Sequence, residues 1–223
     1  MRARSLQGRL LALVPGVVAP VWLLAVLRSE AQRCKRCPLF GDATQMVFGE
    51  GPLDARLMLV GEQPDDQEDL AGRPWTGPAG KLLERALAEA GLDRQTLYLT
   101  YSVKHFKFSS TNIFRQAVST TAAEQRACQP WLRAEIQRVQ PRVIVCLGAV
   151  AARQLISVDF DWRGQRGQWC EWPDGTRLIA TAHPADLLQT KQPAIRERAH
   201  EKFVDDLREV AMAFTRLSEA LTP

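Results

Sequence analysis

The sequence predicts an α/β fold, a three-layer α/β/α sandwich around a short, mostly parallel sheet of four strands. Short apolar runs that end in glycine or polar residues are typical of buried parallel strands, and two such runs are Leu57–Val60 and Val143–Leu147. Segments with helical spacing follow both runs, as expected for repeated βα units. Strands beginning near Leu57, Leu97, Val143 and Leu178 would place their following loops at one active edge.

The first half of this domain contains a strand, a helix and a second strand. Leu57–Val60 is followed by Gly61 and Pro64, which should end the first strand. Residues 80–90 carry apolar side chains at helical spacing, and Gly91 stands where that helix should end. Leu97–Val103 is rich in aromatic and β-branched residues, which predicts the next strand.

The second half should begin after a polar loop over residues 109–120. Thr121 and Glu124 have the spacing of a capping box, which predicts a helix that Pro130 should kink or restart. The remaining expected elements are a strand over 142–148, a helix over 149–156, a hairpin or short connection joining 169–172 to 177–182, and a closing helix over 193–217.

Length and composition fit one globular domain with a sizeable core. The chain has 223 residues and is 46% hydrophobic, which leaves little room for a second full domain. We expect an N-terminal apolar or helical segment over 1–30 and the folded domain over 31–218. Its net charge of +4 permits nucleic-acid binding without arguing for it.

The N-terminal stretch Leu10–Leu27 carries no charge and lies between Arg9 and Arg28. A membrane anchor or targeting signal would have such flanks, but Pro15 and Pro20 interrupt the stretch. An amphipathic or packing segment is the favoured interpretation, and a membrane or targeting role is the alternative.

Five carboxylates follow the first predicted strand within eight positions: Glu62, Asp65, Asp66, Glu68 and Asp69. A solvated acidic loop is the ordinary interpretation of such a run. The alternative is a site for general-base or cation-stabilising chemistry, because the loop lies where α/β sheets bind ligands.

Two cysteines, Cys34 and Cys37, have a spacing that can hold part of a metal centre. A structural zinc or a redox dithiol would also fit, and Cys128 and His105 are the candidate partners. Cys146 is expected inside a buried strand and Cys170 in a hairpin. The Cys-x-x-Cys pair suits a reducing cytoplasm with a metal better than a disulfide framework, so we expect a cytoplasmic protein.

Several common nucleotide and hydrolase motifs are missing from the sequence. It contains no GxxxxGK[ST] loop, no GxGxxG fingerprint and no GxSxG elbow, which weakens nucleotide-hydrolase and esterase interpretations. We therefore expect no nucleotide cofactor.

Two segments resemble sequence motifs of the uracil-DNA glycosylase superfamily. The first is Gly61-Glu-Gln-Pro64 with Glu68-Asp69 and Gly72-Arg-Pro-Trp75-x-Gly77-x-Ala79-Gly80, and the second is His183-Pro-Ala-Asp-Leu-Leu188. The match is to family 4 and its X-type relatives, which bind uracil-DNA covalently. It covers about Cys34 to Leu207 and implies base excision from DNA by a monomer.

The resemblance implies roles for particular residues. Glu62 would position water or shield the sugar cation, Asp66 would assist, and His183 would stabilise the departing base. The base would be contacted by Gln63, Trp75 and Tyr101, with Trp75 at a place where the family usually has Phe. Pro184 and Leu187 would contact DNA. Apart from the resemblance, basic and aromatic residues interleave over 104–108, which predicts that Lys104 meets DNA phosphates. Lys104 could equally belong to a solvated strand end.

The resemblance also implies a [4Fe-4S] cluster. In family 4 the four ligands are cysteines, and in X-type relatives the third is a histidine, as at His105 here. Cys34, Cys37, His105 and Cys128 would then be the ligands, with a structural role for the cluster.

Three positions depart from the family pattern. Asp65 replaces a glycine after Gln-Pro, Tyr101 replaces an asparagine that reads the edge of uracil, and Ala117 replaces the covalent histidine of X-type proteins. We therefore expect no covalent adduct and weak or altered activity on uracil. The favoured hypothesis is a DNA glycosylase, and the alternative is a non-covalent protein that binds uracil or damaged DNA. An electron-transfer iron-sulfur protein is disfavoured, because the other motifs would then have no purpose.

Overall fold

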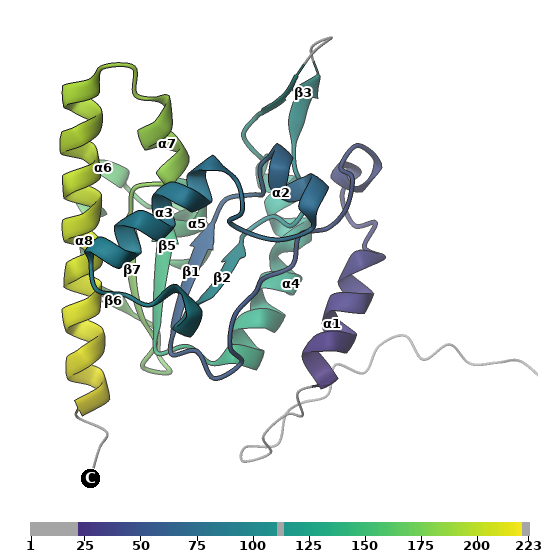
Figure 1. Cartoon of the computed structure of the whole chain (residues 1–223). Helices are drawn as coiled ribbons and strands as arrows, with labels where there is room; N and C mark the ends of the chain where they lie inside the picture. Colours follow the sequence, from purple (N-terminus) through teal and green to yellow (C-terminus); the bar gives the residue numbers. More distant parts are fainter. Residues whose placement is uncertain (1–21, 111–113, 220–223) are drawn as a thin grey trace, which may run out of the picture.

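The computed structural model describes residues 22–110 and 114–219, and its centre is a five-stranded sheet in the order β2-β1-β5-β7-β6 (Figure 1). The first four strands in this order run parallel, and β6 pairs antiparallel with β7. The sheet thus has one strand more than the four predicted, because the expected hairpin forms and adds β6. The strands are β1 (Leu57–Gly61), β2 (Tyr98–Tyr101), β5 (Val143–Leu147), β6 (Cys170–Glu171) and β7 (Arg177–Thr181).

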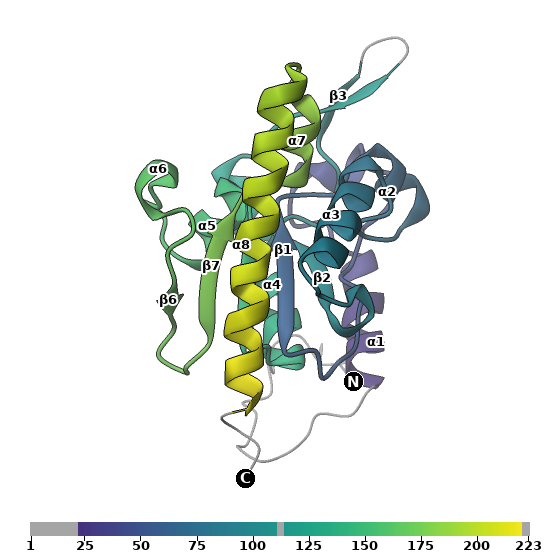
Figure 2. The same cartoon turned by 60° about the vertical axis from the view of Figure 1, so that its left-hand side comes forward.

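Helices cover both faces of the sheet, which confirms the three-layer α/β/α class (Figure 2). Alternate residues of a strand face opposite sides, so Leu57 and Leu59 join one core while Met58 and Val60 join the other. The first core is closed by α3 (Pro78–Glu89) and α8 (Pro193–Glu219), and the second by α4 (Ala122–Val139) and α5 (Ala149–Leu155).

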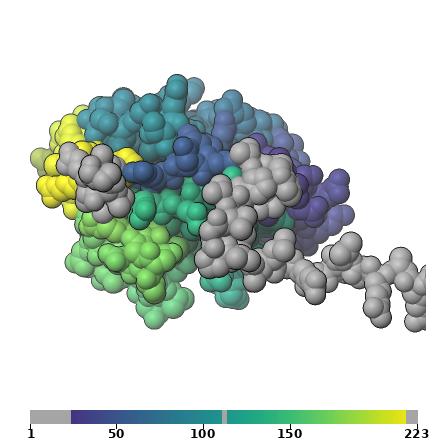
Figure 3. All heavy atoms as spheres, turned by 90° about the horizontal axis from the view of Figure 1, so that it is seen from below, coloured from purple at the N-terminus to yellow at the C-terminus, as the bar shows by residue number. Residues whose placement is uncertain are grey.

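The N-terminal helix α1 (Trp22–Gln32) lies against α4 and stands at the opposite end of the molecule from α8 (Figure 3). A short 3₁₀ turn, η1 (Pro38–Gly41), follows it. None of the helices in the described part of the chain is long and apolar enough to cross a membrane. Most of the apolar stretch discussed above, residues 10–21, lies outside the described residues.

The sequence signals for helix ends are largely confirmed. Thr121 accepts from the backbone N–H of Glu124 while Glu124 accepts from that of Thr121, which completes the predicted capping box of α4. Gly91 has φ of 75°, which suits a residue just after a helix end. Pro130 lies inside α4 and does not divide it, so the predicted restart is wrong.

The expected loop over 109–120 is partly wrong, because it contains strand structure. β3 (Phe108–Ser110) pairs antiparallel with β4 (Arg115–Ala117), and this hairpin projects beyond the main sheet (Figure 1). The three-residue strands are too short to show a clear alternation in the sequence. The remaining short elements are α2 (Asp66–Ala71), η2 (Arg94–Thr96), α6 (Trp162–Gln165) and α7 (Pro184–Gln189).

Candidate active site at the carboxyl edge of the sheet

The carboxyl ends of β1, β2 and β7 meet at one edge of the sheet, because these strands run in the same direction. The backbone continues this pairing past the strands, since Val103 N donates to Glu62 O at 2.8 Å. Glu62 follows β1, and His183 follows β7 after Ala182. The fold therefore brings the residues of the two sequence motifs to one edge.

The carboxylate of Glu62 is fixed by a residue that the sequence did not single out. Thr120 donates to Glu62 Oε1 twice, from its backbone N–H and from its hydroxyl, each at 2.9 Å. The negative charge of Glu62 acts on Asp186 of α7, whose pKa is raised first by burial and then by that charge. Glu62 thus has a defined orientation close to α7.

His183 caps α7 and is held in one tautomer. Its Nδ1 accepts from the backbone N–H of Ala185 at 3.2 Å, so the proton of the neutral ring is on Nε2. Burial lowers the pKa of His183 to about 4, which keeps the ring neutral near neutral pH. Nε2 is buried and has no partner among the described residues, so it is a donor available to a ligand.

Trp75 lies between two other rings of the site. Its centroid is 5.0 Å from that of Tyr101 and 5.7 Å from that of His183, and the first pair is stacked. Trp75 Nε1 is a second buried donor with no partner in the described part of the chain. Its backbone has φ of 59°, a left-handed conformation that costs a non-glycine residue about 1–3 kcal/mol and is common at functional sites.

Tyr101 is held by hydrogen bonds on both sides of its hydroxyl. The hydroxyl donates to Glu68 Oε2 at 2.6 Å and accepts from the backbone N–H of Trp75 at 3.1 Å. Burial, followed by the negative charge of Glu68, holds the pKa of Tyr101 well above its usual range. The Tyr101 hydroxyl is thus committed to the protein, and this arrangement does not support the expectation that it reads a base.

Asp65 has a structural role that explains its departure from the family pattern. It caps α2 and accepts from Glu68 N at 2.9 Å, while Glu68 accepts from Asp65 N at the same distance. Burial and the nearby Asp65 raise the pKa of Glu68 to about 7. Asp65-x-x-Glu68 has the spacing of a capping box, a local sequence signal that predicts the start of α2.

The side chain of Gln63 is also committed to the protein. Its amide donates to Val118 O at 2.9 Å and accepts from Lys107 N at 2.8 Å, which ties β1 to the base of the β3–β4 hairpin. A contact of Gln63 with a base remains a prediction.

Asp66 starts α2, and its carboxylate pairs with Arg115 of β4. Arg115 also pairs with the buried Asp69 at 2.7 Å, and Asp69 in turn accepts from Thr44 N at 3.0 Å. Arg115 therefore fixes the hairpin to α2. The assignment of Asp66 as a second catalytic carboxylate remains a prediction.

The expectation that Lys104 contacts DNA is wrong. The side chain has 0% exposure, and its ammonium pairs with the equally buried Glu135 of α4. It also donates to Tyr101 O at 2.8 Å. Interleaved basic and aromatic residues predict an exposed segment, but a buried carboxylate on another element determines where this lysine points.

The expected DNA contacts of α7 also need correction. Leu187 is 3% exposed and belongs to the core with α3 and α8, while Pro184 is buried at the first turn. Neither side chain is free to enter DNA. Leu188, the next residue, is 42% exposed.

Two of the cysteines predicted as ligands, Cys37 and Cys128, belong to one small buried cluster. The pKa of Cys37 is raised by burial and by negative charge on Cys34, and burial raises the pKa of Cys128 to about 12. Trp131 Nε1 donates to Cys34 Sγ and Lys104 N to Cys128 Sγ, both at 3.2 Å. Cys146 is buried in β5 and Cys170 lies in β6, as predicted.

His105 is 5% exposed, and burial lowers the pKa of its ring. The ring is therefore neutral near neutral pH, which is the form that binds metals. Within residues 22–110 and 114–219, no group of three or more Cys, His, Asp or Glu side chains is close enough to hold a single metal ion.

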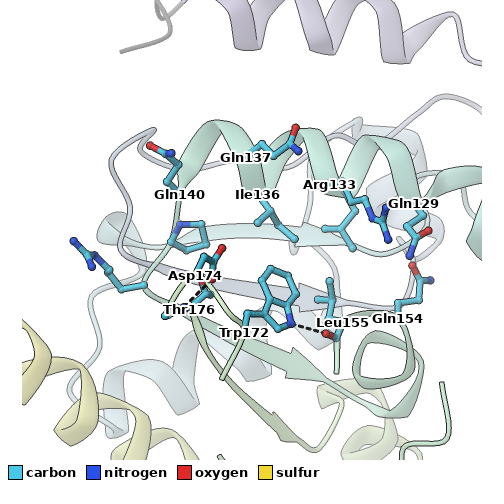
Figure 4. A pocket seen from close by; sticks show the side chains of 14 residues that line it. Gln129, Arg133, Ile136, Gln137, Gln140, Gln154, Leu155, Trp172, Asp174 and Thr176 are labelled. Atoms are coloured by element: carbon cyan, nitrogen blue, oxygen red, sulfur yellow. Dashed lines mark hydrogen bonds between the residues drawn. The ribbon is translucent and has the colours of Figure 1, made fainter. Parts of the chain in front are cut away.

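A cavity of about 1120 Å³ lies away from this edge, between α4, α5 and the β6–β7 turn (Figure 4). Ile136, Leu155 and Trp172 contribute apolar surface, and Trp172 Nε1 donates to Leu155 O at 2.9 Å. It contains none of the predicted site residues, so it is not the candidate active site.

Comparisons with known proteins agree with these motifs. The family model described as the uracil DNA glycosylase superfamily matches residues 48–208. A type-4 uracil-DNA glycosylase from Thermotoga maritima is 35% identical over 175 residues, which cover 78% of this chain and 88% of the relative. A type-4 enzyme from Archaeoglobus fulgidus is 33% identical, covering 78% and 86%, and a type-5 enzyme from Pyrobaculum aerophilum is 32% identical, covering 61% and 64%. This chain therefore belongs to the uracil DNA glycosylase superfamily.

Proposed function

We propose that this chain is a DNA glycosylase that excises uracil or a related base in base-excision repair. Family membership supports the reaction class, and the type-4 relatives supply uracil as the first substrate to test. The observation that carries the proposal is the geometry of His183, whose Nδ1 accepts from Ala185 N and whose buried Nε2–H has no partner among the described residues, at the sheet edge that also carries Glu62.

The proposed chemistry is hydrolysis of the bond between the base and the sugar. As that bond breaks, its electron pair moves to the pyrimidine, and His183 Nε2–H donates to the base oxygen on which negative charge develops. Glu62 is held through Oε1 by Thr120, so its other oxygen orients a water molecule and accepts a proton as that water adds to the sugar carbon.

DNA binding requires the target nucleotide to leave the stack, at a cost of a few kcal/mol. An apolar side chain that fills the vacated place would offset part of this cost. We assign this role to Leu188 in place of Leu187, because Leu188 is the exposed one of the two.

We also propose that Cys34, Cys37, His105 and Cys128 hold a [4Fe-4S] cluster. The three thiols influence one another electrostatically, two sulfur atoms accept N–H donors, and His105 is neutral. Such donors are typical around cluster sulfurs, so these residues fit the group. When bound, the cluster would supply a covalent link between the N-terminal segment, the end of β2 and α4.

The test is incubation of the pure protein with single-stranded and duplex oligonucleotides that carry uracil or other modified pyrimidines. Alkaline cleavage then reveals abasic sites, and a denaturing gel without alkali reveals covalent adducts. We expect base release without an adduct, because the exposed Ala117 has no nucleophilic atom. Absence of strand cleavage with every base would contradict the glycosylase proposal.

A further inference from the structure

Two buried aromatic side chains stack on each other at the carboxyl edge of the sheet. Tyr101 and Trp75 stack with an interplanar angle of 24° and are only 1% and 6% exposed. Gly61, at the end of β1, packs closely against both rings. A Cβ atom at Gly61 would lie 2.7 Å from Trp75 Cζ2 and 2.9 Å from Tyr101 Cδ1.

Both rings are fixed in this arrangement. The Tyr101 hydroxyl would lose its bonds to Glu68 and to Trp75 N if the ring turned away. Gly80 packs so closely on Trp75 O that a side chain at residue 80 would collide with it. Hydrogen bonds and close packing therefore fix the relative position of the two stacked rings.

A pyrimidine that stacks on an aromatic ring needs one face of that ring to be open. Trp75 is almost completely buried, and one of its faces is covered by Tyr101. A flipped pyrimidine would have to displace an aromatic ring before it could stack on Trp75. A nucleotide without a base imposes no such requirement, while Glu62 remains positioned for its sugar.

We propose that Tyr101 occupies the base slot, so that this chain binds an abasic nucleotide in preference to one that carries a pyrimidine. The proposal rests on the glycosylase proposal for the location of the substrate. It makes Tyr101 the residue that determines specificity, and it assigns the site a second role in holding base-less DNA, which is also the product of excision.

The test compares the affinity of the protein for three labelled oligonucleotides by fluorescence anisotropy. One carries a tetrahydrofuran abasic analogue, one carries 2′-fluoro-2′-deoxyuridine, which resists cleavage of the base, and one is unmodified. We expect the wild-type chain to bind the tetrahydrofuran strand about tenfold more tightly than the fluorouridine strand, since ring displacement opposes binding of the base.

Two substitutions separate the ring of Tyr101 from its hydroxyl. Tyr101→Asn removes the ring, so it should raise affinity for the fluorouridine strand about tenfold. Tyr101→Phe removes the bond to Glu68 but keeps the ring, so it should retain the wild-type preference. Melting curves of each variant establish that it is folded.

The outcomes distinguish this inference from the glycosylase proposal. If the wild-type chain binds the fluorouridine strand more tightly than the tetrahydrofuran strand, the proposal that Tyr101 occupies the base slot is wrong. The glycosylase proposal would be unaffected by that result. Equal binding of all three strands would overturn the preference for abasic DNA, and base release in the separate excision assay would still support the glycosylase proposal.

Discussion

At the scale of single residues, burial decides what the polar side chains of this protein can do. His183 and Lys104 follow strands of the same sheet, yet one has an unpartnered nitrogen among the described residues and the other is fully paired. Only the unpartnered group can gain a hydrogen bond from a ligand. His183 therefore has a role in the proposed chemistry, whereas Lys104 has no role in binding DNA.

His183 should make stability depend on pH. Its pKa is about 4 in the folded chain, below the unfolded value of about 6.5, so the unfolded chain binds more protons between these values. The contribution of His183 to the free energy of unfolding is therefore fully present above about pH 6.5 and is lost as the pH falls toward 4. Between about pH 7 and about pH 5, urea unfolding should show the wild type losing roughly 2 kcal/mol more than His183→Gln. Equal losses would mean that the ring is accessible to water.

Lys104→Ala should destabilise the fold strongly, because it leaves Glu135 buried without its cation. We expect a loss of about 3–5 kcal/mol in urea unfolding. Lys107→Ala is the matched control, because Lys107 pairs with Glu124 at 3.0 Å and keeps partial exposure, so its loss should be about 1 kcal/mol or less. A stable Lys104→Ala variant whose DNA affinity depends less on salt would instead indicate a phosphate contact.

At the scale of elements, local signals predicted the strands and helices that have strong periodicity or caps. The uninterrupted apolar run Val143–Leu147 predicts a strand that is buried along its whole length, and the spacing of Thr121 and Glu124 predicts the start of α4. The β3–β4 hairpin could not be predicted from local sequence, because the residues that hold it in place are distant in the chain. Gln63 holds its base and Arg115 connects it to α2.

The residues of the site likewise divide into those that lie in recognisable sequence motifs and those that only the folded chain brings next to them. The resemblance to the family motifs identified Glu62, Trp75 and His183, and the fold brings their chain segments to one edge. The partners Thr120 and Asp186 could not be predicted, because they depend on how α4 and α7 approach that edge. The stacking of Tyr101 on Trp75 likewise required the positions of β2 and the turn before α3.

At the scale of the whole molecule, the predicted cluster ligands come from three separate places. Cys34 and Cys37 follow α1, His105 follows β2, and Cys128 lies within α4. A group bound by all four would join the N-terminal helix to the central domain. Loss of one ligand should therefore weaken the attachment of that helix and lower the thermal stability of the domain.

The protein should purify brown, with about four irons per chain if the proposed cluster is complete. Cys128→Ser should lose most of the iron and the visible absorbance, and its melting temperature should fall. Cys170→Ser is the control, because that cysteine lies in β6 away from the proposed ligands and should leave the iron unchanged. Zinc in place of iron in elemental analysis would contradict the cluster.

The most direct measurement of the central claim is the single-turnover rate of base excision by Glu62→Gln, with enzyme in excess over DNA. The substitution keeps the size of the side chain but removes the charge that would stabilise the sugar cation and accept the proton of water. Asp66→Asn is the matched control, because Asp66 pairs with Arg115. We expect Glu62→Gln to lower the rate by about 100-fold or more with little change in DNA affinity, and Asp66→Asn to lower it less. An unchanged rate in Glu62→Gln would contradict the proposed active site.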